Sequence, residues 1–173
     1  AARTLSSVLP IVLEYNDFEQ TYSDNWWEKL KHGTAVYSVV WDSNKDNGLG
    51  DISITSVDLL RIFWEPGIAD IQDSRNLFVV ELVDEEVLDS RYPEHKGKLG
   101  GQTVDVAQYI YDDTVETSKQ SVVVDWYYKT QANGKTVLHY AKFVGTTLLF
   151  ASENEPERFP DGWYDHGMYP FVF

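Results

Sequence analysis

Two short turns in the last third of the chain constrain its fold more than any other feature. Asn133-Gly134 and Gly145 separate three runs that are rich in β-branched and aromatic residues, as strands are. Asn-Gly between two such runs is a strong signal for a two-residue β-hairpin. The three runs are therefore predicted to form an antiparallel meander; they cover residues 121–129, 135–144 and 146–152. A loop over 153–167 and a final strand over 168–173 are expected to follow.

The first half of the chain combines helices with strands. Apolar residues recur every three or four positions over 15–31, which predicts an amphipathic helix that ends at His32-Gly33. The preceding residues 5–13 either continue this helix, with a kink at Pro10, or are separated from it at Pro10. Strands are expected at 34–41, 51–60 and 76–83, and the last of these is apolar enough to be buried on both faces.

Taken together, these elements predict an α+β fold. A short helix is expected over 84–92, with Asp84 as its N-cap and Pro93 as its stop. The fold then has a long N-terminal helix packed on a mostly antiparallel β-sheet, with a C-terminal β-meander. Its parts are a helix and β-hairpin core, a loop-rich connection and the meander, packed as one unit; they are expected at 1–93, 94–120 and 121–173.

Charge and composition exclude several classes of function. The 28 acidic residues outnumber the 14 basic ones, and the net charge of −14 disfavours binding to DNA, RNA or anionic membranes. No apolar run is long enough to span a bilayer, and the first residues lack the pattern of a signal peptide. Without cysteine the chain has no disulfide, no thiol nucleophile and no cysteine-based metal site. It starts without methionine and ends on the apolar run MYPFVF, so we expect a piece of a longer protein.

The stretch from Trp41 to Ile52 resembles a calcium-binding loop. Asp42, Asn44 and Asp46 occupy positions one, three and five of such a loop. Positions six and twelve, however, are Asn47 and Ser53, where an EF-hand has Gly and Glu, and the flanking residues are strand-like. We therefore expect a solvent-exposed hairpin tip, with a calcium-dependent adhesion domain as the weaker alternative.

No other motif predicts an active site. The four histidines lack metal-binding spacing, and acidic pairs such as Asp112-Asp113 and Glu85-Glu86 are expected on a solvated face. The six tryptophans fit either a sugar- or base-stacking platform or packing in a core or interface; they are Trp26, Trp27, Trp41, Trp64, Trp126 and Trp163. Catalytic, cofactor-binding and metal-binding residues are all expected to be absent. A carbohydrate-binding module or small glycosidase remains the alternative from another class.

Five segments in a fixed order carry a resemblance to a known family. They are HGTAVYSVVWD, GDISITSVDLLRIFWEPG, DIQDSRNLFVVELV, VLHYAKFVGTTLLFAS and GWYDHGMYPFVF. In this order they resemble the wing region of portal proteins of tailed bacteriophages and prophages. The similarity runs from about Tyr15 to Phe173 and is weak over residues 94–120.

The resemblance implies a structural subunit and no enzymatic activity. Portal proteins form a ring, typically dodecameric, at one vertex of the capsid, assembled in the bacterial host cytoplasm. The terminase packages DNA through this ring, and the DNA later leaves through it into the tail. The implied partners are other portal subunits, the major capsid or scaffolding protein, the terminase and a head–tail adaptor. No cofactor, membrane or direct DNA contact is implied for this wing piece.

Overall fold

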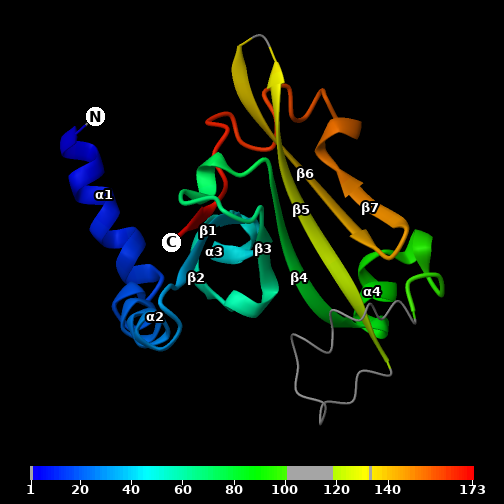
Figure 1. Ribbon diagram of the computed structural model, residues 1–173, viewed down its shortest axis with the longest axis horizontal. Helices are drawn as coiled ribbons and strands as arrows, with labels where there is room; N and C mark the ends of the chain where they lie inside the picture. Colours follow the sequence, from blue (N-terminus) through cyan, green and yellow to red (C-terminus); the bar gives the residue numbers. More distant parts are fainter. Residues whose placement is uncertain (1, 101–118, 133) are drawn as a thin grey trace. The chain divides into compact units, whose positions relative to one another are not determined.

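The computed structural model of the chain describes residues 2–100, 119–132 and 134–173. Helices and two antiparallel sheets confirm the predicted α+β class (Figure 1). The elements fall into two units, the first formed by residues 1–59 with 170–173 and the second by residues 60–169. The predicted boundaries at 93 and 121 stay a prediction.

The first unit begins with two helices where one long helix was expected. They are α1 (Ala2–Tyr15) and α2 (Phe18–His32). Pro10 lies inside α1 and does not end it. The break falls at residues 16 and 17 instead, where Asp17 adopts the left-handed conformation with a φ of 45°. As predicted, α2 ends at Gly33, whose φ is 83° and whose N–H bonds to the Lys29 carbonyl.

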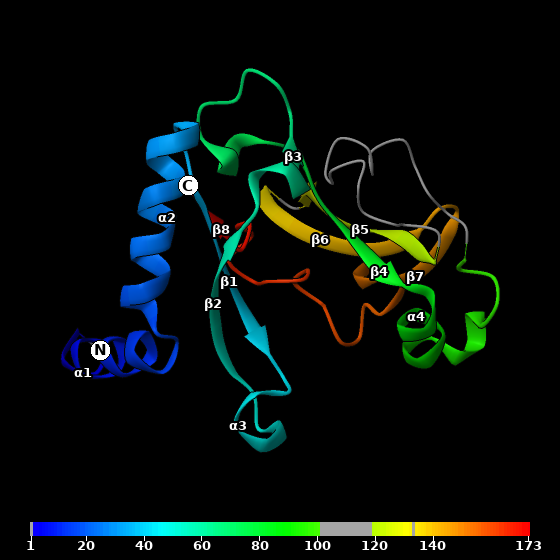
Figure 2. The same ribbon diagram turned by 90° about the horizontal axis from the view of Figure 1, so that it is seen from below.

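A three-stranded sheet completes the first unit. It consists of β2 (Asp51–Val57), β1 (Val36–Asp42) and β8 (Phe171–Val172), in that order. Strands β1 and β2 form a hairpin that is closed by the pair Asp42 and Asp51, with the short helix α3 (Lys45–Gly48) at its tip (Figure 2). The predicted final strand is present as β8, which pairs with Tyr37 and Ser38 of β1.

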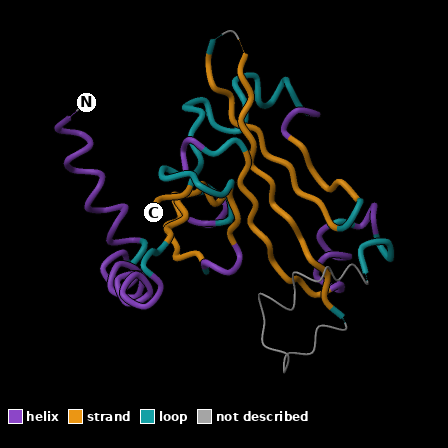
Figure 3. Tube along the Cα trace, viewed as in Figure 1, coloured by secondary structure: helices purple, strands orange, loops and turns teal. Residues whose placement is uncertain are grey.

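The second unit is built on a five-stranded antiparallel sheet (Figure 3). In spatial order its strands are β3 (Ile62–Trp64), β4 (Asn76–Asp84), β5 (Gln120–Ala132), β6 (Lys135–Val144) and β7 (Thr147–Ala151). The last three confirm the predicted meander. Ala132 pairs with Lys135, and Gly134 between them has a φ of 76°, as a tight hairpin requires; Asn133 lies outside the described residues.

A helix and short single-turn segments surround this sheet. Helix α4 (Glu85–Arg91) is the predicted short helix, and its Leu88 packs with Leu99, Val123 and Val144 in a buried apolar cluster. The single turns of 3-10 helix are Leu59–Arg61, Ile71–Asp73, Pro93–His95 and Ser152–Asn154.

One local prediction for this region is wrong, and another is confirmed in position only. Residues 76–83 are not buried on both faces, because Glu81 is exposed and its carboxylate pairs with Arg61 at 3.1 Å. Asp84 does precede α4, but its side chain makes no capping hydrogen bond. Its carboxylate instead accepts a hydrogen bond of 3.1 Å from the side-chain amide of Gln120, because the two residues pair across β4 and β5.

Candidate interaction surface

Helix α2 turns its aromatic stripe toward solvent. The predicted stripe consists of Tyr15, Phe18, Tyr22, Trp26 and Leu30. Within α2, Phe18 is half-buried against Tyr37, whereas Tyr22, Trp26 and Leu30 are exposed by 51%, 51% and 65%, and the neighbouring Trp27 by 62%. The rings of Tyr22 and Trp26 stack nearly parallel, with centroids 6.4 Å apart. Trp26 therefore does not pack in the core of this unit, and its exposed indole fits either a stacking platform or an interface.

A buried polar residue explains this orientation of α2. Asn25, exposed by only 1%, is the residue of this fully described helix that is buried. Its amide donates a hydrogen bond of 3.3 Å to the Val36 carbonyl, and its oxygen accepts one from the Ser56 hydroxyl. Since both polar atoms of Asn25 are satisfied by the β1–β2 hairpin, the helix presents this side to the sheet and its aromatic residues to solvent.

Helix α1 is open along its length. None of its described residues is buried, although several are large and apolar. They are Leu5, Val8, Leu9, Ile11 and Tyr15. We call these residues and the exposed Tyr22, Trp26, Trp27 and Leu30 the helical surface. Soluble monomers rarely expose so many large apolar side chains on one pair of helices, and such surfaces mark sites of contact with other molecules.

The elbow between the helices is held to the sheet by Asn16. Its amide nitrogen donates to the carbonyls of Val12 and Ile52, at 2.8 and 3.1 Å. Its oxygen accepts from the backbone N–H of Ile54 at 3.0 Å and from the Lys45 ammonium at 2.7 Å. Asn16 thus bonds the outer edge of β2 as a neighbouring strand would, and this fixes where α1 ends.

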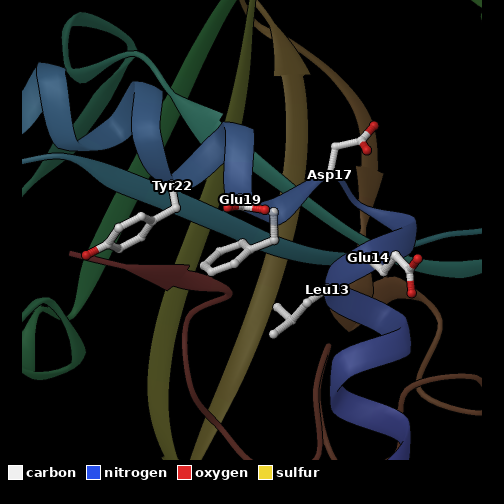
Figure 4. Close-up of a pocket in the computed structure, with 6 residues that line it drawn as sticks. Leu13, Glu14, Asp17, Glu19 and Tyr22 are labelled. Carbon is white, nitrogen blue, oxygen red and sulfur yellow. The ribbon is translucent and has the colours of Figure 1, made fainter.

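A hollow of about 690 Å³ lies at this elbow (Figure 4). Six residues line it: Leu13, Glu14, Asp17, Phe18, Glu19 and Tyr22. Leu13 and Phe18 are half-buried, whereas the three acidic residues are exposed. In the described part of the chain, no ion pair involves any of these three carboxylates. The elbow pocket therefore combines apolar lining with carboxylates that lack a cation.

The loop that resembled a calcium site is the tip of the β1–β2 hairpin. The Asp42 carboxylate accepts a hydrogen bond of 2.9 Å from the Asn44 backbone, as in a turn, and Asp46 and Asn47 have positive φ. Trp41 covers Gly50 so closely that a Cβ there would lie 2.6 Å from the indole. Within the described ranges, no three histidine or acidic residues are grouped as metal ligands would be.

The other candidate residues make contacts within their own units. His32 lies beside Glu28 at 3.1 Å, whereas His139 contacts Thr130 at 2.9 Å in the other unit. Trp126 stacks between Phe78 and Tyr128. Asp112 and Asp113 lie outside the described residues.

The second unit contains two polar networks that join its parts. The Tyr140 hydroxyl donates to Asp125 at 2.6 Å, and burial raises the pKa of this phenol; Asp125 also pairs with Lys142 at 3.0 Å. The Lys129 ammonium donates to the Gln72 carbonyl at 2.6 Å and lies 4.2 Å from the centre of the Tyr169 ring. Burial lowers the pKa of Lys129. The first network joins β5 to β6, and the second joins the turn at Gln72 and the ring of Tyr169 to β5, so both have the character of structural contacts.

One comparison with known proteins finds a family that matches most of the chain. The model of the phage P22-like portal protein family matches residues 1–165 of the 173-residue chain. A search of curated proteins finds no match. In the part of the chain that the structure describes, no helix is both long and apolar enough to cross a membrane.

Proposed function

The chain belongs to the phage P22-like portal protein family, and from this premise we propose that it forms the wing of a subunit in a closed portal ring. Membership of the family makes the chain a phage structural protein and a component of the virion. The ring is the channel through which DNA is packaged into the capsid and later ejected. Assembly takes place in the cytoplasm of the bacterial host.

The exposed helical surface is the observation that carries this proposal. Large apolar side chains on α1 and α2 are open in the isolated chain, and burying them against a neighbouring copy stabilises an assembly. Aromatic residues are enriched in the cores of such interfaces, and this surface contains Tyr15, Tyr22, Trp26 and Trp27.

The remaining partners follow from the role of a portal. A capsid or scaffolding protein, the terminase and a head–tail adaptor meet the ring at different faces. DNA passes through the ring without contacting this part of the subunit, because a chain with 28 acidic and 14 basic residues gains nothing from approaching phosphates. The chain needs neither catalysis nor a cofactor for this role.

The test is to produce the full-length subunit and to image it by electron microscopy. Closed rings are expected. A full-length protein that stays monomeric at micromolar concentration, with no closed rings, would contradict the proposal.

A carbohydrate-binding module is the second candidate, because Trp26, Trp27 and Trp41 are all exposed. It predicts heat release when the chain is titrated with a panel of polysaccharides. The portal proposal predicts no heat in that calorimetric titration.

A further inference from the structure

The elbow pocket is built for a positively charged group with an apolar stem. Leu13, Phe18 and Tyr22 provide apolar and aromatic lining, and Glu14, Asp17 and Glu19 line the same hollow, with the Glu14 and Asp17 carboxylates turned away from Leu13 and Tyr22 at its rim (Figure 4). A lysine or arginine side chain satisfies both, because its methylene groups pack on apolar surface while its charged end reaches the carboxylates.

Helix electrostatics explain only part of this charge. Glu19 lies in the first turn of α2, where the helix dipole favours an acidic residue. Glu14 lies near the carboxyl end of α1, where the dipole favours a cation, and the last turn of α1 contains no basic residue. The ammonium of Lys45 lies at the elbow, but it donates to Asn16 and to the Ile52 carbonyl and forms no ion pair with the three carboxylates, so these still lack a cation of their own within the described residues.

The complementary group lies at the other end of α2. The last turn of this helix contains Lys29, Lys31 and His32, next to the exposed Trp27 and Leu30. The Lys31 ammonium pairs with Glu28 at 3.1 Å, whereas Lys29 makes no ion pair within the described ranges. We call Trp27, Lys29, Leu30 and Lys31 the basic end.

The pocket and the basic end of one chain are too far apart to meet. They lie at opposite ends of a helix of 15 residues, which is about 22 Å long at 1.5 Å per residue. A contact between them therefore requires two molecules. A closed ring is made by such a head-to-tail contact, in which two different patches of the same chain are complementary.

We propose that, in the portal ring, the basic end of α2 in one copy docks into the elbow pocket of the next copy. This inference rests on the proposed function and specifies the neighbour that the pocket takes. The local attraction acts over roughly 8 to 10 Å at moderate salt, so it operates despite the net charge of −14 on each chain. Exposed ion pairs are individually weak, but they select the register and direction of the contact.

Charge reversal in the full-length subunit tests this contact. The elbow variant carries Glu14→Lys, Asp17→Lys and Glu19→Lys, and the end variant carries Lys29→Glu and Lys31→Glu. Each variant alone is expected to lower the yield of rings at least tenfold, as counted by electron microscopy and mass photometry. A control variant reverses three exposed acidic residues of the second unit and is expected to assemble normally; these are Glu94, Glu157 and Asp161.

Mixing the two defective variants gives the most specific readout. In an equimolar mixture each reversed pocket meets a reversed basic end, and each unchanged pocket meets an unchanged basic end, so alternating rings are expected to form. A single chain that carries both sets of changes is expected to recover ring yield as well. Circular dichroism of each variant verifies that it is folded.

The outcomes separate this inference from the proposed function. Rings that form normally in the elbow variant overturn the inference and leave the portal assignment intact. A mixture and a doubly reversed chain that both stay unassembled also overturn it. Absence of rings from the unmodified full-length subunit contradicts the proposed function, and the inference fails with it.

Discussion

Replacing Asn16 by alanine is expected to loosen the elbow between α1 and α2. The substitution removes four hydrogen bonds, which link the Asn16 side chain to Val12, Ile52, Ile54 and Lys45. A hydrogen bond contributes a net 0.5 to 1.5 kcal/mol, and the half-buried site lets water replace part of what is lost. We therefore expect Asn16→Ala to destabilise the elbow by about 2 kcal/mol.

Amide hydrogen exchange measured by NMR reports this loss at a single residue. The Ile54 N–H donates to the Asn16 side chain in the native protein. A loss of about 2 kcal/mol corresponds to roughly thirtyfold faster exchange of this amide, if exchange follows the opening equilibrium. Asn16→Asp keeps an acceptor for Ile54 and Lys45 but loses both donated hydrogen bonds, so about half of the effect is expected.

A matched substitution controls for general effects on the helix. Gln20 is exposed, and its side-chain amide donates to Asp24 at 3.0 Å on the surface of α2. Gln20→Ala is expected to leave exchange of the Ile54 amide unchanged. If that amide exchanges at the native rate in Asn16→Ala, then Asn16 does not hold the edge of β2, and the explanation of the elbow is wrong.

Two further substitutions test contacts in the second unit. Gly162→Ala is expected to lower stability by about 2 to 4 kcal/mol, since φ is 91° and a Cβ there would lie 2.5 Å from the Leu138 carbonyl oxygen. In thermal denaturation, Gly162→Ala should lower the melting temperature more than Gly134→Ala, because Gly134 has a φ of 76° but open space around it. Arg75→Ala tests what lowers the pKa of Glu65. The larger cause is the hydrogen bond from the backbone N–H of Arg75, and the next is the hydrogen bond from its guanidinium. NMR titration should find that this pKa rises only part of the way to 4.5 in the variant, because the backbone bond remains. With a lowered folded-state pKa, the contribution of Glu65 to stability is present above pH 4.5 and is lost as the pH falls through the folded-state value, so Arg75→Ala should weaken this dependence.

The meander could be predicted because its determinants are local. Asn133-Gly134 and Gly145 define turns, and the runs around them have the composition of strands, so few long-range contacts are needed to find them. The end of α2 at Gly33 was predictable for the same reason.

The elbow could not be predicted, because it depends on a tertiary contact. Pro10 was the strongest local signal for a break, yet α1 continues through it. The break occurs at Asn16, whose side chain bonds to Ile52 and Ile54, more than thirty residues away in the sequence. Asn and Asp favour caps and turns, so Asn16-Asp17 was a weak local signal for a break, but it gave no indication of the contact with β2.

Periodicity located the stripe of α2 but not its surroundings. A spacing of three and four residues shows which side chains share a face, and it does not show what covers that face. Asn25 in the middle of the helix was the available signal, since a buried amide needs partners and its partners lie on the β1–β2 hairpin. The same limit applies to the elbow pocket, whose acidic residues become neighbours only after the chain turns at Asp17.

The helical surface is expected to become buried when the full-length subunit assembles. Hydroxyl-radical footprinting with mass spectrometry measures it directly, by comparing the oxidation rates of Trp26 and Trp27 in the isolated chain and in purified rings. Both indoles are more than half exposed in the isolated chain. Both are expected to be oxidised at least fivefold more slowly in rings. Closed rings in which Trp26 and Trp27 are oxidised as fast as in the isolated chain would contradict it.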